Sequence, residues 1–282
     1  MNYYVVIPTY NEEQFIELTL RSLVHQTVLP KKIVVVNDNS TDQTEAIVSR
    51  FCLDYSFIEL VNTTSSALHL PGSKVIQAFQ RGYETLDSEY DIMVKVDADL
   101  IFPPNYFETI LSHFESDPLV GMAGGFAYIE KNQEWILENL TDKDHIRGAF
   151  KAYRKETFLQ IGGLKPAMGW DTVDELLCKF YQWKIVTDAS LKVKHLKPTG
   201  ANYNVLSRYK QGEAFYCLGY GFIITTIASL KLAVRKGKPL LFLDYLKGFW
   251  KAKRAHTPLL VTAEQARFIR AYRWQKMRAK LV

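Results

Sequence analysis

Short apolar runs alternate with amphipathic segments at the start of the chain. The first run is Tyr-Val-Val-Ile at residues 4–7, which leads through a Pro-Thr-Tyr-Asn turn into a segment with apolar residues at helical spacing. A second apolar run at residues 32–36 ends in polar residues and leads into another such segment. Two strand-turn-helix units in succession predict parallel strands joined by right-handed crossovers. In sheets of this kind, ligands bind outside the carboxyl ends of the strands.

A later apolar run, at residues 94–102, carries two carboxylates one residue apart, Asp97 and Asp99. Alternate residues of a strand point to the same side, so the two side chains are expected to present their oxygens together. Such a pair suits Mg²⁺ or Mn²⁺ carrying a diphosphate. A lone pair of this kind is more often a solvated turn where a strand stops, so the interpretation depends on the surrounding motifs.

Three motifs occur in order in this part of the chain. They are Val-Ile-Pro-Thr-Tyr-Asn-Glu at residues 6–12, Val-Val-Asn-Asp-Asn-Ser-Thr-Asp at residues 35–42, and Val-Asp-Ala-Asp at residues 96–99. Together they resemble the inverting family-2 glycosyltransferases, which have the GT-A nucleotide-diphospho-sugar transferase fold. The resemblance extends over roughly residues 3–200. It implies an α/β fold in which helices flank a Rossmann-like, mostly parallel central sheet.

The chain is long enough for one large domain with appended helices. We expect a GT-A catalytic domain over residues 1–205 and a helical, basic extension over residues 206–282.

The resemblance also implies a nucleotide pocket at the ends of the first strands. Tyr10 is expected to pack on the base, Asp38 to contact polar groups of the base or ribose, and Asp97 to contact the ribose. Lys74 is a further candidate, for which a solvated helix lysine is the ordinary alternative. The residues assigned to the nucleotide are Pro8, Thr9, Tyr10, Glu12, Asp38, Lys74 and Asp97.

A metal site follows from the same resemblance. Asp99 is expected to bind Mn²⁺ or Mg²⁺, which would neutralise charge on the leaving diphosphate. Relatives often carry a histidine at the end of a late strand that completes the metal's coordination or touches the diphosphate. His195 is the candidate for that position, and an ordinary surface or core histidine is the alternative.

Glycosyl transfer with inversion needs a carboxylate that removes the proton of the attacking hydroxyl. In the family, a Glu-Asp pair opens a helix near residues 169–177, and its Asp is the base. This chain has Val173-Asp174 there, so the first acid is missing, and Asp174 is the assigned base. The departure from the pattern leaves Asp171 and Glu175 as alternatives. Each acid by itself could simply be a helix-start charge favoured by the helix dipole.

Composition adds a cellular setting. Three cysteines without a metal-binding or CxxC spacing indicate reduced thiols in a cytosolic protein. The first residues enter a strand directly, which makes export unexpected. Residues 231–282 contain fourteen Lys and Arg against two acids, a net charge of +12, whereas the whole chain carries +5. The extension is therefore expected to meet something anionic.

An apolar stretch precedes this basic segment. Residues 214–234 are long enough to span a bilayer, and a buried or interfacial helix is the other possibility. The aromatic and basic run that follows resembles interfacial anchors, which favours peripheral attachment to the inner face of the cell membrane. The aromatic residues expected at the headgroups are Phe242, Tyr245, Phe249, Trp250 and Trp274.

The predicted activity is hexosyl transfer from a nucleoside diphosphate sugar, with UDP the expected nucleotide, to a saccharide or lipid-linked acceptor. Assembly of cell-envelope polysaccharide or glycolipid is the expected setting. A nucleotidylyltransferase would instead need a glycine-rich, basic loop where this chain has Pro-Thr-Tyr-Asn-Glu. A non-catalytic, membrane-bound scaffold with the same fold is the other alternative. Nucleic acid is not expected as a partner, because nothing resembles a recognition motif.

Overall fold

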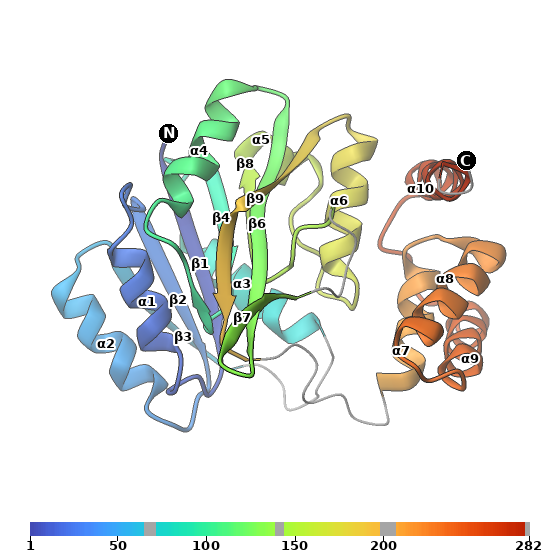
Figure 1. Ribbon diagram of the computed structural model, residues 1–282, viewed down its shortest axis with the longest axis horizontal. Helices are drawn as coiled ribbons and strands as arrows, with labels where there is room; N and C mark the ends of the chain where they lie inside the picture. The colour runs from blue at the N-terminus through green and yellow to red at the C-terminus, as the bar shows by residue number, and fades with distance from the viewer. Residues whose placement is uncertain (65–71, 139–143, 198–206, 280–282) are drawn as a thin grey trace.

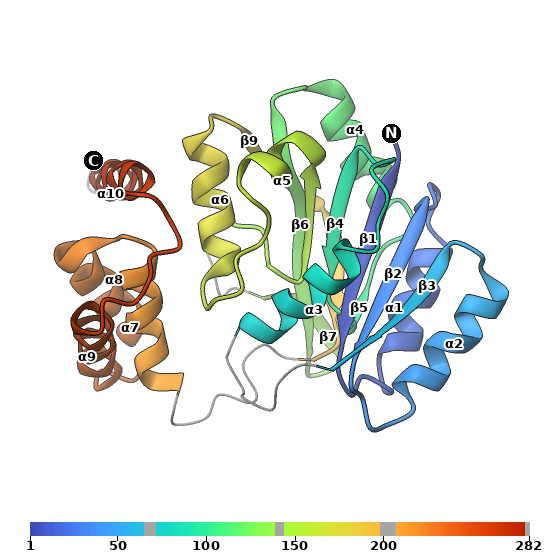
Figure 2. The ribbon, with the colours of Figure 1, turned by 180° about the vertical axis from the view of Figure 1, so that it is seen from behind.

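The computed structural model describes residues 1–64, 72–138, 144–197 and 207–279 (Figure 1). Its centre is a nine-stranded sheet in the order β3-β2-β1-β4-β8-β6-β9-β5, with β7 paired to β6. Helices cover both faces of this sheet. Helices α1, α2 and α4 lie on one face, and α3, α5 and α6 lie on the other (Figures 1 and 2).

The first half of the sheet is parallel, as the alternating pattern predicts. It consists of β3 (Ile58–Thr63), β2 (Lys32–Asp38), β1 (Tyr3–Thr9) and β4 (Ile92–Val96). All seven residues of β1 are buried, because helices cover the strand from both sides. The connecting helices are α1 (Ile16–Val24), α2 (Thr44–Asp54) and α3 (Ser73–Tyr83).

The second half of the sheet mixes directions. Strand β8 (Phe150–Arg154) runs antiparallel between β4 and β6 (Val120–Lys131), and β9 (Lys184–His195) is parallel to β6. The remaining elements of this half are β5 (Leu100–Ile101), β7 (Glu134–Leu137), α4 (Tyr106–Ser116), α5 (Lys155–Gln160) and α6 (Trp170–Phe180). The antiparallel insertion of β8 brings Lys151 directly opposite Lys95 of β4.

Four helices follow the sheet and lie together beside α6 (Figures 1 and 2). They are α7 (Ser207–Cys217), α8 (Gly221–Arg235), α9 (Leu241–Arg254) and α10 (Ala263–Arg278). Helices α7 and α9 cross in backbone contact. A Cβ added to Gly212 would lie 1.8 Å from the Tyr245 carbonyl oxygen, and one on Gly248 would lie 2.0 Å from that of Tyr209. Phe268 of α10 packs against Phe180 of α6, with ring centroids 5.4 Å apart.

The apolar stretch at residues 214–234 is not one helix. It is divided between α7 and α8 by a turn in which Gly219 and Gly221 adopt φ angles of 71° and 73°. This left-handed conformation suits glycine and interrupts the helical hydrogen bonding. None of the helices in the described ranges is both long and apolar enough to cross a bilayer.

Candidate active site

The predicted nucleotide residues gather at the carboxyl ends of β1 and β2. The register pairs Pro8 with Val36 and Thr9 with Asn37, so the two turns that follow lie side by side. The Thr9 hydroxyl donates to the Val36 carbonyl at 3.0 Å, which ties the strand ends together. Asp38 is buried at the end of β2, whereas Tyr10 is 59% exposed. An exposed ring suits the stacking role predicted for Tyr10, and a buried carboxylate suits the polar recognition predicted for Asp38.

Glu12 binds Lys197, a residue that the sequence motifs do not identify. Its two carboxylate oxygens lie 2.7 and 2.8 Å from Lys197 Nζ. Burial raises the pKa of Glu12, and the neighbouring Lys197 ammonium opposes the shift. Lys197 follows β9 by two residues and stands 185 positions from its partner in the chain. The one signal in the sequence is its place two residues after His195.

Lys74 lies in the first turn of α3 and is half-buried. The helix begins after Gly72, whose φ of 74° and close approach to Ala167 leave no room for a side chain. The start of α3 therefore adjoins the turn that leads into α6. The role of Lys74 in binding the nucleotide stays a prediction.

The two predicted metal ligands lie together. Strand β5 pairs with the end of β9, and this pairing brings His195 Nε2 to 3.4 Å from Asp99 Oδ2. Burial disfavours protonation of His195, but the neighbouring carboxylates of Asp99 and Glu138 outweigh this and raise the pKa to about 9. Asp97 instead bonds to the buried ammonium of Lys95. Within the ranges that the structure describes, no three His, Cys, Asp or Glu side chains are arranged to hold a metal ion.

The predicted base belongs to a buried network beneath the start of α6. Lys151 of β8 has no solvent exposure, and its Nζ lies 3.0 Å from both carboxylate oxygens of Asp174 and 3.2 Å from Glu175 Oε1. It also donates to the Asp171 carbonyl at 2.6 Å. The Tyr153 hydroxyl completes the network with a 2.6 Å hydrogen bond to Asp174.

Asp174 is therefore badly placed for the role predicted for it. Its side chain is 1% exposed, and hydrogen bonds from Lys151 and Tyr153 occupy both oxygens. An acceptor hydroxyl cannot reach such a carboxylate without breaking the network. The alternative Asp171 lies in the first turn of α6 with 36% of its side chain exposed. Glu175 is 7% exposed and bound to His145 and Lys151, which makes it as inaccessible as Asp174.

The two halves of the site are joined by paired lysines and a ring. Lys95 binds Asp97 on the donor side, and Lys151 binds Asp174 on the other side. Both ammonium groups lie over Trp170, at 5.2 and 5.9 Å from a ring centroid. A cation over an aromatic face is stabilised where water is excluded.

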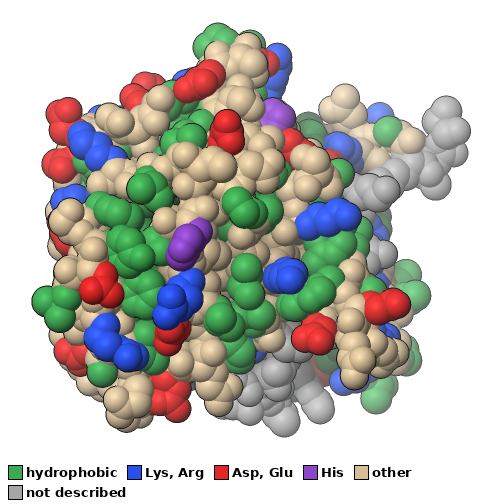
Figure 3. Space-filling model, turned by 60° about the vertical axis from the view of Figure 1, so that its left-hand side comes forward, with side chains coloured by type: hydrophobic (Ala, Val, Ile, Leu, Met, Phe, Trp, Pro, Cys, Tyr) green, Lys and Arg blue, Asp and Glu red, His purple; other side chains and the backbone are tan. Residues whose placement is uncertain are grey.

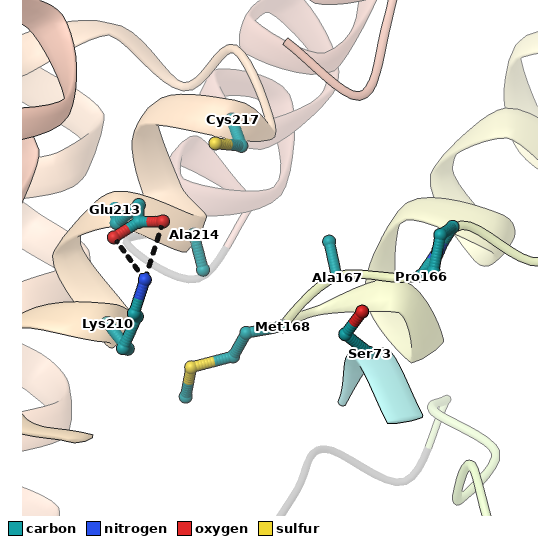
Figure 4. A pocket seen from close by; sticks show the side chains of 8 residues that line it. All are labelled: Ser73, Pro166, Ala167, Met168, Lys210, Glu213, Ala214 and Cys217. Carbon is teal, nitrogen blue, oxygen red and sulfur yellow. Dashed lines mark hydrogen bonds and ion pairs between the residues drawn. The ribbon is translucent and has the colours of Figure 1, made fainter. Parts of the chain in front are cut away.

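A pocket opens where α6 meets α7 (Figure 4). It has a volume of about 130 Å³ and lies between the start of α3, the turn before α6, and α7. Met168 extends from the turn toward α7, on which Lys210 and Glu213 form an ion pair at 2.9 Å. The lining residues are Ser73, Pro166, Ala167, Met168, Lys210, Glu213, Ala214 and Cys217.

Comparison with known proteins assigns the family. The model of glycosyl transferase family 2 matches residues 4–163, more than half of the chain. The chain thus belongs to glycosyl transferase family 2. An uncharacterized glycosyltransferase of Mycoplasma pneumoniae is 30% identical over 175 residues, which cover 57% of this chain and 56% of the relative. The poly-beta-1,6-N-acetyl-D-glucosamine synthase of Staphylococcus aureus is 23% identical over 188 residues, or 59% of this chain and 41% of the synthase.

Solved structures identify the fold as GT-A. The mannosyltransferase PcManGT from Pyrobaculum calidifontis, in complex with GDP-Man and Mn²⁺, has a TM-score of 0.59 at 16% identity. That match covers 98% of this chain and 80% of PcManGT. S. aureus TarS 1–349 in complex with UDP-GlcNAc has a TM-score of 0.59 at 17% identity, covering 89% of this chain and 73% of TarS 1–349. The predicted fold class and family are confirmed.

The buried network generates a prediction about stability. Lys151→Met should lower the free energy of unfolding by about 3–5 kcal/mol at pH 7, because two buried carboxylates lose their cation. Urea unfolding of both proteins would measure the difference. Lys184→Met is the matched control, because Lys184 forms an exposed ion pair with Asp117 at 2.7 Å, and such pairs contribute about 0–1 kcal/mol.

The difference in the free energy of unfolding between Lys151→Met and the unaltered protein should depend on pH. Burial opposes ionisation of Glu175, but Lys151 and His145 overcome this and lower its pKa to about 2 from 4.5. The resulting stability is present above pH 4.5 and is lost as the pH falls toward 2. This difference in the free energy of unfolding should therefore become smaller in acid. A difference in the free energy of unfolding that stays constant from pH 7 to pH 3 would contradict this account.

Proposed function

We propose that the chain is an inverting, metal-dependent hexosyltransferase that uses a UDP-sugar and acts on a saccharide or lipid-linked acceptor in cell-envelope assembly. The observation that carries the proposal is the contact between the two sides of the site. Lys95 binds Asp97, two residues before Asp99 of the Asp99–His195 pair, and Lys151 binds the carbonyl of Asp171, a solvent-facing acid. Both ammonium groups lie over Trp170. TarS binds UDP-GlcNAc and UDP, which supports a UDP-sugar as donor. The nucleotide would lie on Tyr10 and Asp38.

Asp99 and His195 fit a divalent metal ion. One carboxylate and one imidazole already converge to 3.4 Å, and His195 Nδ1 lies 3.6 Å from Glu138 Oε2, beyond hydrogen-bond distance, with no closer partner among the described residues. Carboxylate and imidazole ligands suit Mn²⁺, and ions of this kind are commonly held by few protein ligands together with substrate phosphates. The PcManGT complex contains Mn²⁺, which supports the same choice here. When bound, the ion would offset negative charge on the departing diphosphate.

Asp171 is the base in this proposal, in place of Asp174. Its carboxylate would accept the proton of the acceptor hydroxyl as the hydroxyl oxygen attacks the anomeric carbon from the side opposite the diphosphate. Lys151 holds the Asp171 carbonyl, so the backbone that carries the base is fixed to the sheet. The pocket that includes Met168, three residues before Asp171, would receive part of the acceptor.

Residues 206–282 would attach the enzyme to an anionic membrane surface on the cytoplasmic side. Tyr245 and Phe249, which the sequence assigned to the headgroups, are buried between helices and cannot serve. The structure offers a different apolar surface on α8. Its exposed stripe consists of Ile223, Ile227, Leu230 and Val234, which are 40–69% exposed and follow helical spacing.

Charge favours a bilayer over a second copy of the chain as the occupant of this stripe. Basic residues adjoin the stripe at the end of α8 and on α9, within the segment of net charge +12. Two copies would bring these like charges together, whereas an anionic leaflet attracts each of them by about 1 kcal/mol. The opposite side of the catalytic domain differs, since acidic and basic side chains are interspersed there (Figure 3).

The metal assignment is tested with Asp99→Ala. In Mn²⁺, release of the nucleotide from a panel of UDP- and GDP-sugars should identify the donor for the unaltered enzyme and should fall to background in the variant. Calorimetric binding of UDP should weaken in Mn²⁺ but change little in chelator. Asp188→Ala, which removes an acid paired with His113 far from the site, is the control. Full activity of Asp99→Ala, or of the enzyme in chelator, would exclude the assignment.

The base assignment is tested with Asp171→Asn. This nearly isosteric change removes only the proton-accepting capacity, so turnover should fall by about 10² or more while donor binding persists. Asp174→Asn should instead lower the melting temperature, because its carboxylate stabilises the buried network. Turnover that survives Asp171→Asn but not Asp174→Asn in folded protein would return the role to Asp174.

The membrane surface is tested by sedimentation with vesicles. The protein should bind vesicles that contain phosphatidylglycerol, bind neutral phosphatidylcholine poorly, and be released largely by high salt. The double variant Ile227→Glu, Leu230→Glu should lose this binding and keep donor binding. Leu53→Glu, at an 87% exposed apolar residue of the catalytic domain, is the matched control. Equal binding by the double variant would show that the α8 stripe is not the contact.

A further inference from the structure

We propose that His145 is a positioning residue that acts through Asp171, holding a free ring nitrogen toward that carboxylate to take over the proton it accepts. The inference rests on the proposed function of Asp171 as the base. His145 comes from the segment before β8 and is 15% exposed. Its Nδ1 lies 3.1 Å from Glu175 Oε1, and its Nε2 lies 3.8 Å from Asp171 Oδ2.

Glu175 decides where the proton of a neutral His145 lies. The Glu175 carboxylate also accepts the Ile146 N–H at 2.9 Å and the Lys151 ammonium at 3.2 Å, so it is held in the ionised form. An ionised carboxylate can only accept hydrogen bonds. Nδ1 must therefore donate to Glu175, and the lone pair of the neutral ring is on Nε2, the nitrogen that faces Asp171.

The 3.8 Å separation from Asp171 agrees with this arrangement. With the ring neutral, the ionised carboxylate and Nε2 are both acceptors and cannot hydrogen-bond to each other. Once Asp171 has taken the proton of the acceptor, its O–H can donate to Nε2. The hydroxyl O–H bond breaks and the bond from that oxygen to the anomeric carbon forms. The bond to the diphosphate breaks with its electron pair, and the proton passes by way of Asp171 to His145 and then to solvent.

Other charged groups surround the pair from several elements. Lys151 of β8 contacts Glu175 and the Asp171 carbonyl, and Lys179 of α6 acts on Glu175 at longer range. Asp144, next to His145 in the chain, is paired with Lys276 of α10 at 2.8 Å. The imidazole thus lies between an acid that fixes one nitrogen and an acid that faces the substrate side, which is the arrangement a proton relay needs.

His145→Gln is the test, because glutamine keeps a hydrogen-bond donor for Glu175 and cannot carry the proton. The assay is release of UDP from UDP-GlcNAc in excess Mn²⁺, or of GDP from GDP-mannose if that donor is faster. We expect kcat to fall by about tenfold to a hundredfold, with calorimetric binding of UDP or GDP unchanged. His113→Gln, at another histidine paired with an acid, should leave kcat unaltered.

Rescue by imidazole separates a relay from a structural role. A relay needs a group that can carry a proton, and added imidazole can supply one, whereas it cannot replace a packing contact. His145→Ala should therefore regain kcat when imidazole is added. A loss of kcat without imidazole rescue, or no loss at all, would overturn the proposal.

The roles of Asp171 and His145 can be tested separately. If Asp171→Asn remains active, the base is elsewhere and His145 loses its role with it. If Asp171→Asn is inactive while His145→Gln keeps full kcat, Asp171 is the base and acts without His145.

Discussion

A single buried cation, the Lys151 ammonium, is the constraint on which the second half of the site depends. Removing a charge from water costs several kcal/mol, and only close, well-oriented opposite charges offset that cost. Asp174 and Glu175 supply these charges, and the Asp171 carbonyl adds a further acceptor. Helix α6 is consequently fixed against β8 in both position and rotation. The rotation matters most, because it sends Asp174 and Glu175 inward and leaves Asp171 at the surface.

Because β8 runs antiparallel to β4, a second buried lysine, Lys95, lies close to Lys151. Because β4 and β8 are neighbours, Lys95 lies opposite Lys151, and each neutralises a carboxylate on its own side of the site. Two ammonium groups on adjacent strands would repel each other without these acids and the Trp170 face. The Asp97 side and the Asp174 side of the site are therefore coupled through packing. Any movement of Trp170 would alter the surroundings of both lysines.

Sequence patterns place the predicted donor residues at the ends of parallel strands, but they do not show which acids of α6 are accessible. Asp97 and Asp99 follow an apolar strand, and the position of a ligand at the carboxyl end of parallel strands is a general property of such sheets. Choosing between Asp171 and Asp174 required the rotation of α6, which depends on Lys151, twenty positions away from Asp171 along the chain. No local pattern contains that information.

Other features of the structure could not be predicted from the sequence for similar reasons. Lys197 could not be linked to Glu12, since their contact joins the first strand's turn to the segment after the last strand. The division of residues 214–234 depended on Gly219 and Gly221, which are compatible with a helix until their φ angles are known. Tyr245 and Phe249 of α9 were wrongly expected at a surface, because both are buried against neighbouring helices, whereas Trp250 is exposed as predicted. Composition indicated a basic extension, but not which face of it would be exposed.

The glycine contacts between α7 and α9 have a mechanical consequence. With backbone against backbone at Gly212 and Gly248, the two helices have no compressible side-chain layer between them and must move as one lever. Helix α8 is packed against this lever, and α7 forms one wall of the pocket beside Met168. A tilt of the α7–α9 pair would therefore move this wall and change the width of the pocket.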